Sequence, residues 1–85
     1  MYGVELRARA EKDISSLPPS VARRVLDTIG GLRENPRPAG IRKLEAEGGH
    51  RIRVGDYRIV LEIDDDARRV TVVRVRHRRD AYRGI

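Results

Sequence analysis

The stretch RIRVGDYRIVLEID, Arg51 to Asp64, has the pattern of a β-hairpin. Apolar residues alternate with mostly charged ones on both sides of Gly55-Asp56, which is the period of two strands joined by a two-residue turn. With Gly55 and Asp56 as the turn, Arg53 lies directly opposite Arg58. The sequence therefore predicts a hairpin with one aliphatic face and one basic face.

The predicted pairing of Arg53 with Arg58 places like charges opposite each other, which destabilises an antiparallel pair by a few tenths to about 1 kcal/mol. A bound polyanion would offset this repulsion, because guanidinium groups bind phosphate oxygens in bidentate fashion and stay charged at any working pH. Arginine is also common on solvated sheet faces, and in an arginine-rich chain some pairs fall opposite each other by chance. The pair alone leaves both interpretations open.

Length and charge bound the classes of function. A chain of 85 residues suits one domain, so we expect residues 1–85 to form a single folded unit. The formal net charge of +6 favours an anionic partner such as a nucleic acid or an acidic protein. Lysine occurs only at Lys12 and Lys43, a bias that GC-rich coding explains as well as selection for guanidinium does.

The scarcity of metal-binding and redox-active side chains narrows the chemistry. Cysteine is absent and histidine occurs only twice, which argues against disulfides, thiolate chemistry and a histidine metal site, so no cofactor is expected. The first residues carry charge without the apolar core of a signal peptide, and no apolar run approaches the ~18 residues of a membrane span. We therefore expect a cytoplasmic protein with no membrane partner.

The remaining pattern predicts a short strand at residues 2–7, a helix at 8–17, a second helix from Pro19, and a third long strand at 70–77 after a turn of charged residues. The helical stripes consist of Ala10, Ile14 and Leu17, then Val21, Val25, Ile29 and Leu32. Gly30-Gly31 lies inside the second stripe, and each glycine destabilises a helix by about 1 kcal/mol relative to alanine. The second helix therefore either permits a close crossing there or ends early. Residues 41–50 are predicted to form a polar connection with Leu44 as its apolar anchor.

The faces of the predicted sheet follow from alternation. The aliphatic face is expected to hold Ile52, Val54, Ile59, Leu61, Ile63, Thr71, Val73, Val75 and His77, and the opposite face to hold Val70, Val72, Arg74 and Arg76 beside the hairpin arginines. The order β-α-α-β-β-β predicts an α+β fold, with two N-terminal helices packed on one face of a mainly antiparallel β-sheet. The opposite face is predicted to be basic.

A family resemblance rests on the segment KLEAEGGHRIRVGDYRIVLEIDDDARRVTVVRVRHRRDAYR, Lys43 to Arg83. It resembles the RelE/ParE superfamily of toxins from type II toxin-antitoxin systems, whose hallmarks are Lys-Leu, an alternating basic strand, GDYR, an aliphatic strand and a closing HR..Y. The helical N-terminal half fits in length and order. The resemblance implies a RelE-like fold and a toxin that enters the ribosomal A site and cleaves mRNA without a metal. In that reaction the ribose 2′-OH attacks the adjacent phosphate and leaves a 2′,3′-cyclic phosphate and a free 5′-OH.

The resemblance also implies roles for individual residues, which are matched position by position. The implied catalytic residues are Arg53, Arg58, Arg78 and Tyr82, and Arg51 is implied to bind phosphate. Alternation on the basic face adds Arg74 and Arg76 as candidate RNA- and phosphate-binding residues. Among these, Arg53, Arg58 and Arg78 would hold the scissile phosphate and stabilise the charge that develops on its oxygens. Arg51 would hold a flanking phosphate.

One departure from the family pattern concerns the general base. The best-studied members carry lysine where this chain has Arg51 and Arg53, and arginine, with a pKa of about 12.5 or above, effectively cannot accept the 2′-OH proton. Tyr82 is therefore the predicted base, its pKa being lowered from near 10 by the surrounding guanidinium charge. Stacking on a nucleobase is its alternative role.

Other polar residues are expected to be structural. His50 and His77 share the parity of the aliphatic strand residues. The run Asp64–Asp66 is expected to form a solvated turn, because three consecutive side chains do not easily converge on one metal ion. Tyr57 is expected to pack at the start of its strand with the hydroxyl at the rim.

Two other functions remain open on the sequence. One is a ParE-like toxin that binds and poisons DNA gyrase without nuclease activity, and the other is a basic domain that binds RNA or an acidic protein without chemistry. Retention of Arg58, Arg78 and Tyr82 favours the nuclease, whereas arginine at positions 51 and 53 weakens it. The resemblance implies a cognate antitoxin whose acidic or amphipathic segment forms a hetero-oligomer with the toxin. The nuclease would also have the ribosome and mRNA as partners.

Overall fold

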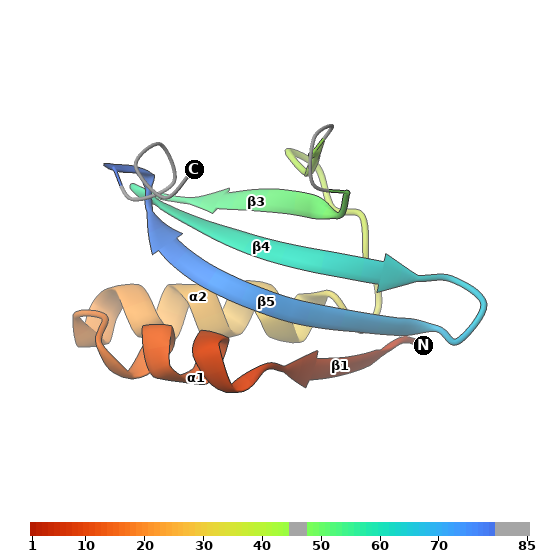
Figure 1. The fold of residues 1–85 in the computed structure, drawn as a ribbon, viewed down its shortest axis with the longest axis horizontal. Helices are drawn as coiled ribbons and strands as arrows, with labels where there is room; N and C mark the ends of the chain where they lie inside the picture. Colours follow the sequence, from red (N-terminus) through yellow and green to blue (C-terminus); the bar gives the residue numbers. More distant parts are fainter. Residues whose placement is uncertain (45–47, 80–85) are drawn as a thin grey trace.

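A computed structural model describes residues 1–44 and 48–79 of the chain. Its elements are β1 (Gly3–Leu6), α1 (Ala8–Ser15), α2 (Pro19–Gly31), β2 (Arg42–Lys43), β3 (His50–Val54), β4 (Tyr57–Asp64) and β5 (Arg69–His77). The strands form one five-stranded sheet in the order β1-β5-β4-β3-β2. β1 runs parallel to β5, and the other neighbouring pairs are antiparallel. Both helices lie against the same face of the sheet (Figure 1), which confirms the predicted α+β fold.

The two helices begin and end close to where their sequence patterns do. Pro18 and Pro19 separate them, and Pro19 occupies the first turn of α2, where its missing N–H costs no hydrogen bond. α2 continues through Gly31, and a Cβ built on Gly30 or Gly31 would meet no atom within 4 Å. The two glycines therefore permit no close crossing, and they form the last turn of the helix.

The β3–β4 hairpin has the predicted register. Val54 pairs with Tyr57 across the Gly55-Asp56 turn, and Arg53 pairs with Arg58. β2 is a short edge strand, antiparallel to β3, in a segment that was predicted to be a polar connection. A two-residue strand has too little pattern to be recognised without its partner strand.

A β-bulge interrupts the pairing of β5 with β4. Val60 pairs with Arg74, whereas the next residue, Leu61, pairs with Val72, so that Val73 is one extra residue on β5. The alternation of β5 therefore changes parity at Val73.

The bulge corrects the predicted faces of β5. Val70 and Val72, predicted on the basic face, are fully buried in the core. Thr71 and Val73, predicted on the aliphatic face, are only half-buried. Beyond the bulge Val75 returns to the core, at 3% exposed. Strict alternation was the wrong assumption, because it cannot bury valines on both sides of an extra residue.

The core lies between the two helices and the sheet. Its buried residues are Ala10, Val25, Ile29 and Leu32 from the helical segment and Ile52, Val54, Ile59, Leu61, Val70, Val72 and Val75 from the strands. Ile63, also predicted on the aliphatic face, packs against this cluster and is partly buried. No helix in the described ranges is long and apolar enough to span a membrane.

Candidate active site

Arginines form a row across three strands on the sheet face that the helices leave uncovered. Arg53 on β3 pairs with Arg58 on β4, and Arg58 pairs with Arg76 on β5. Directly opposite residues in antiparallel strands have Cβ atoms about 4.5–5.5 Å apart, so these three side chains start close together. We call Arg53, Arg58 and Arg76 the arginine row.

Burial differs along the arginine row. Arg53 is exposed, whereas Arg58 and Arg76 are half-buried, and the Nε atom of Arg58 is shielded from solvent. Long arginine stems lie along a sheet and keep their charged ends toward water. The arginine row therefore lies at the end of the sheet next to the hairpin turn, with Arg53 its most exposed member.

The residue after β5 is fastened to that same turn. The backbone N–H of Arg78 donates a hydrogen bond to the carbonyl oxygen of Asp56 at 2.7 Å. This hydrogen bond brings Arg78, whose side chain is exposed, to the end of the sheet where Arg53 and Arg58 lie. Arg78 lines a hollow there with Tyr57 and His77. Tyr82 lies outside the described residues.

A second set of basic residues lies one step farther from the turn. Arg42 pairs with Arg51, Arg51 pairs with Val60, and Val60 pairs with Arg74. A hollow of about 330 Å³ beside β2 and β3 is lined by Arg42, Arg51 and Arg53 among others. Arg51 thus has Arg42 as its neighbour, a residue that sequence reasoning did not connect with the site because β2 was not predicted.

Arg74 is held from the side by a carboxylate of α1. Its Nε and Nη2 atoms donate to the two Asp13 oxygens at 2.8 and 3.2 Å, and the backbone N–H of Val75 donates to Asp13 at 2.9 Å. The two side chains are 30% and 18% exposed. Burial raises the pKa of the Asp13 carboxyl, but the hydrogen bonds from Arg74 and Val75 outweigh it and leave that pKa below its usual value.

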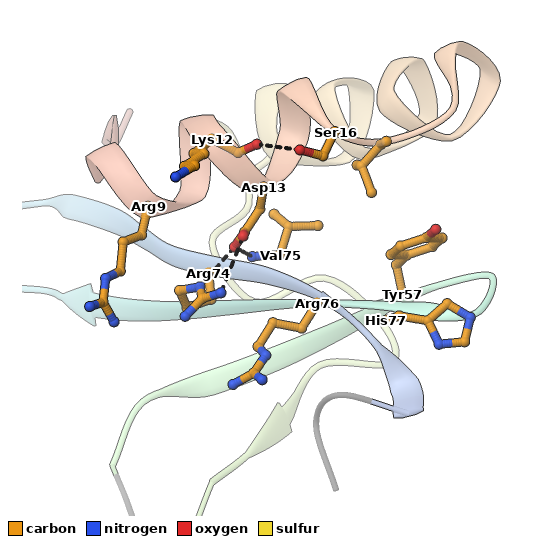
Figure 2. A pocket seen from close by; sticks show the side chains of 10 residues that line it. Arg9, Lys12, Asp13, Ser16, Tyr57, Arg74, Val75, Arg76 and His77 are labelled. Atoms are coloured by element: carbon orange, nitrogen blue, oxygen red, sulfur yellow. Dashed lines mark hydrogen bonds and ion pairs between the residues drawn. The ribbon is translucent and has the colours of Figure 1, made fainter. Parts of the chain in front are cut away.

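A groove of about 650 Å³ lies between α1 and the second half of β5. In Figure 2 the groove has Lys12 and Ser16 on its helix side, Arg74 and Arg76 on its strand side, and Tyr57 and His77 at one end. The rings of Tyr57 and His77 meet edge to face, with centroids 5.1 Å apart. The Arg79 backbone N–H donates to His77 Nδ1 at 3.2 Å, which fixes the imidazole in this position.

The other residues considered from the sequence lie away from the arginine row. Asp65, in the turn between β4 and β5, accepts hydrogen bonds from both terminal nitrogens of Arg37 and from the Tyr2 hydroxyl. These bonds lower the pKa of Asp65 to about 2. Asp64 accepts a hydrogen bond from the Ala67 backbone N–H at 3.0 Å. The acidic run thus forms a turn, as predicted.

His50 is half-buried on the core side of β3. Its Nδ1 atom is buried and has no hydrogen-bond partner among the described residues. Burial, followed by the positive charges of Arg37 and Lys43, lowers its pKa. The neutral imidazole is therefore the form that the fold favours near neutral pH.

Comparison with known proteins identifies the family. Residues 4–82 match the family model described as the ParE toxin of type II toxin-antitoxin system, parDE. The chain is 36% identical over 85 residues to the toxin RelE of Mycobacterium tuberculosis, covering 96% of this chain and 87% of that protein. The chain belongs to the RelE/ParE superfamily of type II toxins.

Other RelE/ParE relatives agree with this assignment. Toxin RelG of M. tuberculosis is 35% identical over 85 residues, covering 96% of this chain and 97% of RelG. The structure of the RelBE2 toxin-antitoxin complex from the same organism matches with a TM-score of 0.79 at 32% identity, covering 89% of this chain and 96% of that one. The structure of the archaeal RelE-RelB complex from Pyrococcus horikoshii matches with a TM-score of 0.82 at 26% identity. The match covers 91% of this chain and 94% of that one.

Proposed function

We propose that this RelE/ParE toxin is a metal-independent endoribonuclease that cleaves mRNA in the ribosomal A site. The arginine row is the observation that carries the proposal. Three arginines occupy directly paired positions on the sheet face opposite the helices, and like charges placed directly opposite each other repel. A phosphodiester placed among them turns that repulsion into charge-assisted hydrogen bonds.

In the proposed reaction the 2′-oxygen of the ribose forms a bond to the adjacent phosphorus while the bond from phosphorus to the 5′-oxygen breaks. Arg53 and Arg58 bind the non-bridging oxygens and stabilise the charge that builds on them, and Arg78 adds a third donor from the end of β5. The phenolate form of Tyr82 accepts the proton of the 2′-OH, because the arginines cannot accept it. The departing 5′-oxygen takes a proton from solvent and leaves as the free 5′-OH.

The flanking residues of the site have supporting roles in this proposal. Arg51, with Arg42 beside it across the β2–β3 pairing, binds a neighbouring phosphate. Arg76 extends the arginine row onto β5. Arg74 shares its charge with Asp13, so its contribution to phosphate binding is weaker than that of Arg51 or Arg76.

An antitoxin is the expected protein partner. The M. tuberculosis and P. horikoshii relatives were crystallised as complexes with their RelB antitoxins. By analogy, a cognate antitoxin with an acidic or amphipathic segment would cover the basic face of this toxin and form a hetero-oligomer with it. The toxin would act in the cytoplasm, where translating ribosomes are found.

Poisoning of DNA gyrase is the second candidate function. It is favoured by the match to the ParE toxin family model and by arginine at positions 51 and 53. Primer extension on a defined mRNA in a purified translation system, with and without ribosomes, tests the proposal. Cuts at A-site codons that appear only with ribosomes support the nuclease. An intact message, from toxin that still arrests growth and inhibits purified gyrase, would reject it.

A further inference from the structure

We propose that the groove between α1 and β5 is a binding seat for one nucleotide of single-stranded RNA, beside the arginine row. This inference rests on the proposed function for the identity of the strand, because that strand would be the RNA whose neighbouring phosphate lies in the arginine row. The nucleotide's phosphate would be bound by Arg9, Lys12 and Arg76. Its base would lie against Tyr57 and His77.

The groove exists because β5 loses its neighbouring strand halfway along. β1 pairs with β5 only as far as Leu6 opposite Val72, and beyond the bulge α1 lies along the edge of β5. Asp13 accepts the Val75 N–H at this edge, where a further strand would otherwise pair. The groove therefore lies between a helix and a strand edge, and the hydrogen bonds of Asp13 to Arg74 and Val75 hold the two elements together at its base.

The charges that line the groove favour an anion. Asp13 is the only acidic residue among the described lining residues, and Arg74 and Val75 already engage both of its oxygens. The Asp13–Arg74 pair is close to neutral as a unit. Arg9 and Lys12, both exposed, have no hydrogen bond or ion pair at their charged ends within the described residues. Together with Arg76 they place three basic residues in the lining of one groove.

The position of Arg76 connects the groove with the arginine row. Arg76 lines the groove and also pairs with Arg58 across β4 and β5. One extended strand can therefore place one phosphate on the arginine row and another in the groove. Aromatic rings at the end of such a phosphate path are typical of surfaces on which single-stranded bases stack, and Tyr57 and His77 supply them here.

The first experiment measures binding to the isolated toxin by NMR. The probe is a 5′-phosphorylated DNA trinucleotide of thymidine, which lacks the 2′-OH and so cannot be cleaved. We expect the ring resonances of Tyr57 and His77 to shift. The double substitution Arg9→Ala with Lys12→Ala should weaken binding about fivefold, because each exposed charge pair contributes modestly. It should also reduce the dependence of log K on log salt by about 0.7 for each phosphate that the variant no longer neutralises.

The matched control removes the same charge elsewhere. Arg23 and Arg33 are exposed and do not line the groove, so Arg23→Ala with Arg33→Ala should change affinity less than twofold. If both double variants weaken trinucleotide binding equally, the nucleotide seat is overturned, and general electrostatic attraction accounts for the binding. A hexaglutamate peptide that shifts the same ring resonances by as much, and binds as tightly as the trinucleotide, would overturn the nucleotide seat. The groove would then be a site for an acidic protein segment. Unshifted rings would also reject the nucleotide seat.

A second measurement separates this inference from the proposed function. If the toxin cleaves mRNA, the Arg9→Ala, Lys12→Ala variant should need more ribosome–mRNA complex for half-maximal rate while its saturated single-turnover rate stays within twofold of wild type. Trinucleotide binding that depends on Arg9 and Lys12, without any cleavage by wild type, removes the nuclease and keeps the seat. Wild-type cleavage and trinucleotide affinity in the double variant would remove the seat and keep the nuclease.

Discussion

Replacing Asp13 with alanine should destabilise this toxin by about 2–3 kcal/mol. Asp13 accepts two hydrogen bonds from Arg74 and one from the Val75 N–H, at 2.8, 3.2 and 2.9 Å, and it is only 18% exposed. A hydrogen bond to a charged group contributes about 1.5–3 kcal/mol when it is protected from solvent. The expected sum is smaller than three such bonds because Arg74 remains partly solvated. For a domain of this size, the loss corresponds to a fall in Tm of roughly 10–20 °C.

The Asp13 prediction is checked by urea and thermal unfolding followed by circular dichroism. Asp13→Asn should fall between wild type and Asp13→Ala, because an amide oxygen still accepts the Val75 N–H while the charge is lost. Asp27→Ala, at an exposed position of α2, is the control and should change stability by less than about 0.5 kcal/mol. An Asp13→Ala variant that is no less stable than Asp27→Ala would contradict the claim that the hydrogen bonds between Asp13 and β5 stabilise the fold.

The stabilisation by Asp13 should also depend on pH. Its pKa is lower in the folded toxin than its usual value, which lies near 3.9 in an unfolded chain. The contribution is therefore fully present above about pH 4 and is lost as the pH falls through the lower pKa of the folded state. The stability difference between wild type and Asp13→Ala should shrink accordingly at the acid end of the titration. A difference that stays constant from pH 7 to pH 2 would contradict this reasoning.

Further substitutions test the bulge, a turn and a buried histidine. Val72→Ala should destabilise the toxin by about 1.5–2.5 kcal/mol and Val73→Ala by clearly less. The reverse order in urea unfolding would contradict the bulge at Val73 and support strict alternation along β5. Gly49→Ala should cost more than Gly48→Ala, because both have positive φ but only at Gly49 would a Cβ lie 2.7 Å from a backbone oxygen. Similar midpoints for the two glycine variants would argue against that clash. His50→Leu should reduce the loss of stability between pH 8 and pH 5, because the lowered pKa of His50 makes protonation oppose folding; an unchanged loss would contradict this.

Local patterns predict most of the fold. The hairpin register follows from two strands with a period of two around Gly55-Asp56, and the helices follow from apolar stripes bounded by Pro18-Pro19. These features are determined by residues that are close together in the sequence, so a local pattern is enough to predict them. The pairing of Arg53 with Arg58, on which the candidate site depends, was predictable for the same reason.

The features that could not be predicted depend on residues far apart in the chain. Alternation placed Arg74 and Arg76 on the basic face correctly but placed Val70 and Val72 there as well. Only an extra residue can put the valines in the core and keep the arginines outside, and a sequence of consecutive β-formers does not reveal where it lies. Asp13 binds Arg74 across 61 positions of sequence, so no local signal connects them.

The groove was missed for a related reason. Arg9 and Lys12 belong to the polar side of a short amphipathic helix, which in sequence looks like any solvated surface. Their relevance appears only once α1 lies along β5 and brings them near Arg76. Position 82, the proposed base, lies outside the described residues, so its role rests on the family resemblance.

Single-turnover cleavage of mRNA on programmed ribosomes by Arg58→Ala tests the central claim most directly. Loss of one preorganised donor to a developing oxyanion typically lowers the rate by about 10²–10³-fold. We predict a loss of that size in a variant that still folds and still binds the antitoxin. Arg58→Lys should recover part of the rate, and Arg23→Ala should cleave as wild type. A rate for Arg58→Ala within twofold of wild type would contradict the assignment of the arginine row to the scissile phosphate.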